Sequence, residues 1–143
     1  MTGVISMIHP IERSLTALII GGVLERHPRL KIVSAEHDVA WIAFFLHRID
    51  KYAARGVSTI KLPMKPSDYV KRQVYATFIN DPVFMNLLEF YPADNIMWSS
   101  DYPHGQATFL GSQDYVNERL SKVPEPDRRM IVRDKAAKLY NLN

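Results

Sequence analysis

The residues best suited to chemistry lie in one stretch, residues 95–105 (NIMWSSDYPHG). Its apolar run 96–98 predicts a buried strand over residues 95–100. Pro103 cannot donate to a sheet ladder, so the strand must end before it. Asp101 and His104 therefore fall in the loop beyond the strand, where open α/β sheets and (β/α) barrels carry their chemistry. The alternative is a solvated loop in which the aspartate caps the next helix.

Polar residues also follow two other predicted strands. Residues 31–36 and 73–78 are rich in β-branched and aromatic side chains and are uninterrupted by turn residues, so both segments predict strands. The polar residues at their ends are Glu36, His37, Asn80 and Asp81. In a parallel sheet these residues and Asp101 meet at one edge, which favours a functional site over a solvated loop.

The elements that must position these residues are predicted from hydrophobic spacing and helix caps. Helices are expected over residues 10–26, 39–55, 67–72, 82–91, 112–122 and 127–140. Strands that alternate with helices predict an α/β fold of parallel βαβ units. Asp81, Ser67 and Ser112 are expected as helix caps. The aromatic stripe of the second helix is expected in the core; it comprises Trp41, Phe44, Phe45 and Tyr52.

Composition and charge narrow the class of protein. The chain has 143 residues, of which 47% are hydrophobic, and this suits one globular domain. Its net charge of +3 arises from basic residues scattered among acidic ones, so we expect no nucleic-acid partner. The absence of cysteine excludes thiolate metal ligands. We expect a cytoplasmic protein without membrane contact, since neither a leader pattern nor a membrane-spanning stretch is present.

Four segments together resemble the C-terminal part of the amidohydrolase-related (amidohydrolase 2) family, which includes aminocarboxymuconate semialdehyde decarboxylase and hydroxybenzoate-type decarboxylases. They are GGVLERHPRLKIVSAEHDVAWIAFFLHRID, RQVYATFINDP, ADNIMWSSDYPH and AAKLYNL. The resemblance implies strands six to eight of a metal-dependent TIM (β/α)₈ barrel. Residues 1–143 would form a single but incomplete domain that lacks the N-terminal half of the barrel.

The resemblance also implies roles for individual residues. Asp101 matches the aspartate that binds the divalent metal or helps to activate water beside it. Glu36 and His37 match a catalytic or substrate-facing position, and the register between them stays open. His104 matches a pocket residue with a substrate or supporting role. Asn80 and Asp81 are expected to line the substrate-binding rim. Zinc is the leading candidate for the metal and manganese is the alternative.

One departure from the family pattern bears on activity. The chain contains no His-x-His pair, which the family uses as metal ligands; its histidines are His9, His27, His37, His47 and His104. A catalytic zinc usually needs three protein ligands, so we expect an incomplete or absent site in this chain. The first interpretation is a segment of a hydrolase or non-oxidative decarboxylase acting on a small carboxylated, cyclic or aromatic substrate. The second is an inactive barrel fragment or interaction module.

The number of predicted strands raises an expectation about assembly. Three parallel strands cannot close a barrel and would leave sheet edges and apolar surface exposed. Surfaces of that kind promote association. We therefore expect a homo-oligomer or a larger parent chain.

Overall fold

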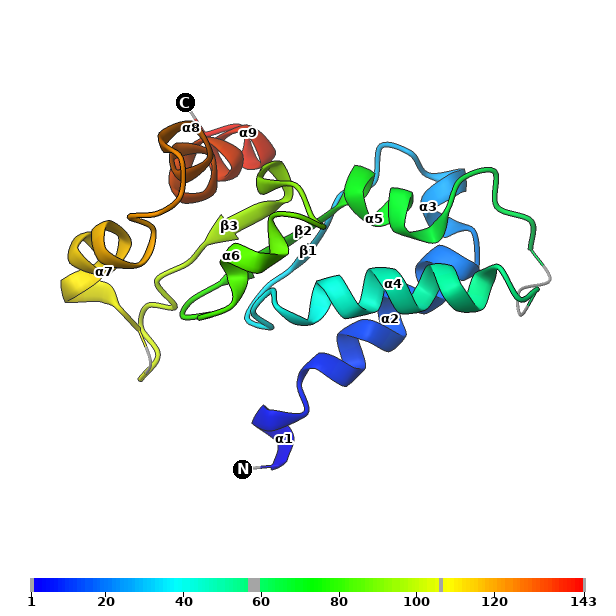
Figure 1. The fold of residues 1–143 in the computed structure, drawn as a ribbon, viewed down its shortest axis with the longest axis horizontal. Coiled ribbons are helices and arrows are strands. Elements are labelled where there is room, and N and C mark those ends of the chain that lie inside the picture. Colours follow the sequence, from blue (N-terminus) through cyan, green and yellow to red (C-terminus); the bar gives the residue numbers. More distant parts are fainter. Residues whose placement is uncertain (1, 57–59, 106, 143) are drawn as a thin grey trace.

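A small parallel sheet forms the centre of the protein, as the computed structural model of residues 2–56, 60–105 and 107–142 shows (Figure 1). Its strands are β1 (Ile32–Ser34), β2 (Val74–Phe78) and β3 (Ile96–Trp98), hydrogen-bonded in that order. Both pairs are parallel, with Ser34 opposite Ala76 and Ala76 opposite Ile96. The predicted α/β architecture is confirmed, and each strand is shorter than expected.

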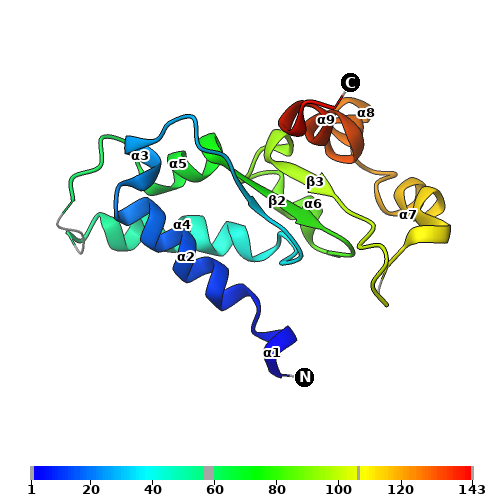
Figure 2. The same cartoon turned by 180° about the vertical axis from the view of Figure 1, so that it is seen from behind.

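Helices lie on both sides of this sheet. Those before β2 gather at one side of the molecule and those after β3 gather at the other (Figures 1 and 2). They are α1 (Thr2–Ile5), α2 (Ile8–Ile20), α3 (Val23–Arg26), α4 (Trp41–Ala53), α5 (Pro66–Gln73), α6 (Phe84–Leu87), α7 (Ser112–Arg119), α8 (Glu125–Arg129) and α9 (Lys135–Tyr140). Short helical turns η1 (Ala93–Asn95), η2 (Phe109–Gly111) and η3 (Met130–Asp134) complete the described elements. Among the described helices, none is long and apolar enough to cross a membrane.

The first predicted helix, 10–26, is interrupted at Gly21 and Gly22. Gly22 adopts a left-handed backbone with φ of 70°, which ends α2 and lets α3 begin in a new direction. A Cβ atom on Gly21 would lie only 2.5 Å from the carbonyl oxygen of Ala17. The prediction of one continuous helix is therefore wrong, because these glycines form a turn rather than a close helix contact.

The core lies between one face of the sheet and the helices. Alternate strand residues such as Val74, Ala76, Phe78 and Ile96 pack in one cluster with Leu15 and Ile42. Phe78 stacks on Phe84, with ring centroids 4.6 Å apart. The core expectation for the α4 stripe is correct for Phe45 but wrong for Phe44 and Tyr52, which are 60% and 39% exposed and both lie under the Arg48 guanidinium.

Side-chain bonds to the backbone explain why two strands begin late. Gln73 ends α5 rather than starting β2, because its buried amide donates to the carbonyl oxygens of His27 and Leu30. Asn95 belongs to η1, and its amide donates to the carbonyl oxygen of Val74 over 2.7 Å. Both residues lie at the ends of helical elements, and their side chains tie the strand entries to neighbouring segments.

The expected caps at Ser67 and Ser112 are wrong. Ser67 lies within the first turn of α5, and its hydroxyl donates to Asp50 Oδ2 over 2.7 Å. Ser112 is the first residue of α7, and its hydroxyl donates to the carbonyl oxygen of Thr108. In each case the serine is used inside the helix rather than before it.

The last predicted helix, 127–140, begins two residues earlier, at Glu125, and contains the π-helical turn η3. Lys135, the first residue of α9, is only 8% exposed. Its Nζ lies 5.7 Å from the ring centre of Tyr75 on β2 and 3.8 Å from Asp94 Oδ2. The C-terminal helices are thereby held against the sheet.

Candidate functional site

The carboxyl ends of the strands open onto one edge, as predicted for parallel neighbours. Glu36 follows β1, and Asp101 and His104 follow β3. Each of the three offers a ligand atom, and these atoms all lie within 4.8 Å of one another. The tertiary fold therefore gathers two carboxylates and an imidazole from loops that are distant in the sequence. We call Glu36, Asp101 and His104 the ligand cluster.

Unusual backbone conformations gather at the same edge. Glu36, Asp38 and Asp101 have φ values of 65°, 51° and 58°. A left-handed conformation costs a non-glycine residue on the order of 1–2 kcal/mol and persists where the surrounding structure imposes it. Asn141, which shares this geometry, simply ends α9. Strain at three positions around the ligand cluster favours a functional edge over a solvated loop.

Asp101 and His104 form the closest pair of the cluster. His104 Nδ1 lies 2.9 Å from Asp101 Oδ1, and the side chains are 65% and 12% exposed, respectively. The hydrogen bond that His104 donates to Asp101 is the largest cause of its raised pKa, followed by the charges of Asp101 and Glu36. The pair therefore favours the protonated imidazole in the metal-free protein.

Replacing Asp101 by asparagine is expected to lower the pKa of His104, because the hydrogen bond and charge that raise it are removed. In the native protein, the contact contributes stability that is fully present below the ordinary imidazole pKa of 6.5. That contribution is lost as pH rises through the raised value of the folded state. NMR titration of the imidazole protons in chelator-treated protein measures the shift. Asp50→Asn is the control, and an unchanged His104 titration in Asp101→Asn would contradict the assignment.

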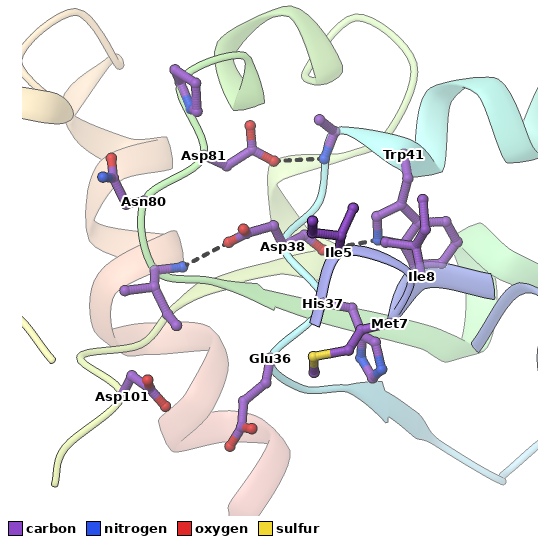
Figure 3. Close-up of a pocket in the computed structure, with 13 residues that line it drawn as sticks. Ile5, Met7, Ile8, Glu36, His37, Asp38, Trp41, Asn80, Asp81 and Asp101 are labelled. Atoms are coloured by element: carbon purple, nitrogen blue, oxygen red, sulfur yellow. Dashed lines mark hydrogen bonds between the residues drawn. The ribbon is translucent and has the colours of Figure 1, made fainter. Parts of the chain in front are cut away.

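A cavity of about 560 Å³ lies beside the ligand cluster (Figure 3). Its polar wall contains Glu36, His37, Asp38, Asn80, Asp81 and Asp101. Ile5, Met7 and Ile8, from the N-terminal end of the chain, supply apolar wall. The size suits a small molecule, and a few convergent polar groups on an apolar surface are typical of binding sites.

The structure separates the neighbours Glu36 and His37. Their side chains leave the chain in different directions, and only Glu36 belongs to the ligand cluster (Figure 3). His37 Nδ1 lies 3.2 Å from the hydroxyl oxygen of the buried Ser34. This contact orients the ring within the cavity wall and makes Nε2 the nitrogen that a bound molecule can meet.

The two residues expected at the rim have different surroundings. Asn80 is exposed, and its Oδ1 accepts a hydrogen bond from the Tyr115 hydroxyl over 2.9 Å. Asp81 is only 6% exposed. Its Oδ1 accepts from the backbone N–H of Val83, and its Oδ2 accepts from those of Val39 and Ala40. A substrate role for either residue stays a prediction.

Asp81 also explains a shortened helix. The expected helix over 82–91 is reduced to α6, and its N-cap is Val83 rather than Asp81. The Asp81 carboxylate is shared between the backbone before α6 and the first amides before α4. Its capping interaction therefore serves mainly a helix from another part of the sequence.

Asp38 is a cavity residue that the sequence analysis did not select. Its Oδ1 accepts a hydrogen bond from the backbone N–H of Ile79 over 3.2 Å. Desolvation is the main cause of its raised pKa; the Ile79 hydrogen bond opposes the rise and the Asp81 charge adds to it. The available signal was its place directly after Glu36 and His37 at a predicted strand end.

The ligand cluster suits a divalent cation. Two carboxylates and an imidazole are donors that Zn²⁺ and Mn²⁺ accept. Ligands about 2.1 Å from a tetrahedral metal lie about 3.4 Å apart, so atoms that are as much as 4.8 Å apart must approach by up to about 1.4 Å. The exposed side chains of Glu36 and His104 have room for that movement. The residues therefore fit a three-ligand site with an open position.

Comparisons of the sequence and of the structure with known proteins point to one family. The sequence model described as amidohydrolase matches residues 2–142. No curated protein matches significantly. An amidohydrolase from Mycobacterium avium subsp. paratuberculosis K-10 is similar at 29% identity and a TM-score of 0.78, over 90% of this chain and 33% of that chain.

Two further solved structures are similar to the chain. The 5-carboxyvanillate decarboxylase from Sphingomonas paucimobilis has 26% identity and a TM-score of 0.74, over 90% of this chain and 38% of its own. A dihydroxybenzoic acid decarboxylase from Polaromonas sp. JS666, with bound manganese and 2-nitroresorcinol, has 24% identity and a TM-score of 0.72. The match covers 92% of this chain and 40% of that one. The latter likeness shows the fold alone. The chain spans about a third to two fifths of these proteins.

Proposed function

The chain belongs to the amidohydrolase family, and we propose that it supplies strands six to eight of a metal-dependent barrel enzyme. The observation that carries this proposal is the convergence of Glu36, Asp101 and His104 at the carboxyl edge of the sheet. Barrel enzymes carry their catalytic groups at that edge. The coverage of a third to two fifths of the similar structures supports a partial barrel.

For the reaction, we favour non-oxidative decarboxylation of a small aromatic carboxylate over hydrolysis. One similar structure, at 26% identity, bears the name of a decarboxylase that acts on 5-carboxyvanillate. The cavity of about 560 Å³ beside the cluster accommodates a molecule of that size. Its apolar wall suits an aromatic ring, and the cluster suits the carboxylate end.

The residues take the following roles in this proposal. Asp101, Glu36 and His104 would hold the divalent metal and leave a position open for substrate or water. The metal, when bound, supplies Lewis acidity that orients the substrate carboxylate or activates a water. Decarboxylation breaks the bond between the ring carbon and the carboxylate, and CO₂ leaves. The imidazole of His37 gives a proton from Nε2 to the same carbon, while Ser34 holds the ring in orientation. Asn80 bonds a polar substituent at the rim.

The test begins with the metal-free protein. Chelator-treated chain is titrated calorimetrically with Mn²⁺ and Zn²⁺, and saturable binding of about one ion per chain is expected. The metal-loaded protein is then incubated with dihydroxybenzoates and 5-carboxyvanillate, and the release of CO₂ is measured. In parallel, it is incubated with a panel of esters and amides, and their hydrolysis is measured. Hydrolysis of the esters or amides would overturn decarboxylation as the reaction, while the proposal of a metal-dependent enzyme of this family would stand.

Two other results would favour the inactive fragment or interaction module. Protein that binds neither metal saturably would contradict the proposed metal site. Protein that binds metal without turnover would indicate that the remaining strands of the barrel are required. Adding those strands, from a longer chain, then becomes the decisive comparison, because the three described strands cannot enclose a barrel interior.

A further inference from the structure

The loops after β1 and β2 are fastened to each other by exchanged hydrogen bonds. Asp81 Oδ2, after β2, accepts from the backbone N–H groups of Val39 and Ala40 over 3.0 and 2.6 Å. In the other direction, Asp38 Oδ1, after β1, accepts from the backbone N–H of Ile79 over 3.2 Å. Figure 3 shows one such bond at the Asp81 carboxylate and another at the Asp38 carboxylate, each joining the two loops. The arrangement binds two chain segments whose positions in the sequence are far apart.

A further bond reaches a member of the ligand cluster itself. The backbone N–H of Glu36 donates to Thr77 Oγ1 on β2 over 3.2 Å. Glu36 has the left-handed backbone, which its residue type does not favour. Its side chain is exposed and would sample several rotamers if the loop were free. The direction of the Glu36 side chain therefore depends on bonds made by the neighbouring strand.

Asp81 is well suited to hold this loop. It is buried, and three backbone N–H groups point at its two carboxylate oxygens. Two of these groups precede the first turn of α4, where the helix dipole favours a negative charge. Hydrogen bonds from amides to an ionised carboxylate are among the stronger ones in proteins. With its oxygens engaged in this way, Asp81 is placed to hold the backbone of the loop after β1.

We propose that Asp81 and Thr77 are positioning residues that hold Glu36 against Asp101 and His104, so that metal affinity depends on contacts remote from the metal. This inference rests on the proposed metal site. Outer bonds that orient metal ligands typically change affinity by about 10–100-fold when removed. The hydrogen bonds accepted by Asp38, Thr77 and Asp81 hold the backbone of the loop after β1, and that backbone orients Glu36.

The experiment compares Mn²⁺ affinity by calorimetry at a temperature where circular dichroism shows each variant folded. Asp81→Asn is expected to weaken binding about 10-fold or more. Thr77→Val removes only the acceptor at the Glu36 amide, and a loss of several-fold is expected. Asp50→Asn is the matched control. The Asp50 carboxylate also accepts hydrogen bonds, from the backbone N–H and the hydroxyl of Ser67, but it lies outside the ligand cluster. Its replacement is therefore expected to leave Mn²⁺ affinity unchanged.

A double-mutant cycle separates positioning from general destabilisation. If Asp81 acts through Glu36, the effect of Asp81→Asn disappears in a Glu36→Gln background, because the residue to be positioned no longer ligates. An equal effect in both backgrounds overturns the positioning role, as does unchanged affinity in Asp81→Asn. Wild-type protein that binds no Mn²⁺ overturns the metal site, and the positioning role with it. If the wild-type protein binds Mn²⁺ but Asp81→Asn has an equal effect in both backgrounds, the positioning role alone is overturned.

Discussion

Replacing Asp101 by asparagine is expected to lower Mn²⁺ affinity by about 100-fold or more. Losing an outer-shell partner already costs about 10–100-fold, and Asp101 is proposed as a direct ligand. The substitution removes a negative charge with little change in shape. Asparagine also tolerates the left-handed backbone that Asp101 adopts at φ of 58°, so the loop should keep its course.

The chain offers a matched control in the surface pair His9 and Glu12. This pair also has three-residue spacing, with His9 Nδ1 lying 3.7 Å from Glu12 Oε2, but it lies outside the ligand cluster. Glu12→Gln should leave Mn²⁺ affinity unchanged. Isothermal titration of the three proteins, after chelator treatment, makes the comparison. An affinity for Asp101→Asn within about threefold of wild type would contradict a role as metal ligand.

Replacing Phe78 by alanine is expected to lower the free energy of unfolding by about 3–5 kcal/mol. Phe78 is only 1% exposed and stacks on Phe84 in the core. Truncation loses the transfer free energy of the ring and leaves a cavity that the close-packed surroundings can only partly fill. The loss is a large fraction of the roughly 5–15 kcal/mol typical of a folded domain.

Phe90→Ala serves as the control for this measurement, because Phe90 is 54% exposed. A change of about 0.5 kcal/mol or less is expected there. Urea unfolding followed by circular dichroism gives both values, provided that the slope of free energy against urea is unchanged. A cost below about 1 kcal/mol for Phe78→Ala would show that the β2 core is loosely packed. It would also weaken the case for a rigid loop at Asn80 and Asp81.

Local patterns predict elements well where they depend on neighbouring residues. The α4 helix and the strands predicted over 31–36, 73–78 and 95–100 follow from periodicity, and the structure confirms their types but shortens the strands. Element ends are less predictable, since distant partners decide them. Gln73 ends α5 and its side chain bonds His27, and Asp81 divides its carboxylate between Val83 and Val39. Such bonds join positions that no local pattern connects.

The sequence by itself determined the parallel α/β order, the placement of Asp101 and His104 after a strand, and the family resemblance. Hydrophobic period, turn residues and motif spacing are local properties of the chain. Only the tertiary structure decided between Glu36 and His37 as the partner of Asp101 in the ligand cluster. That choice depends on the left-handed backbone of Glu36 and its bond to Thr77, which exist only after β1 and β2 have paired.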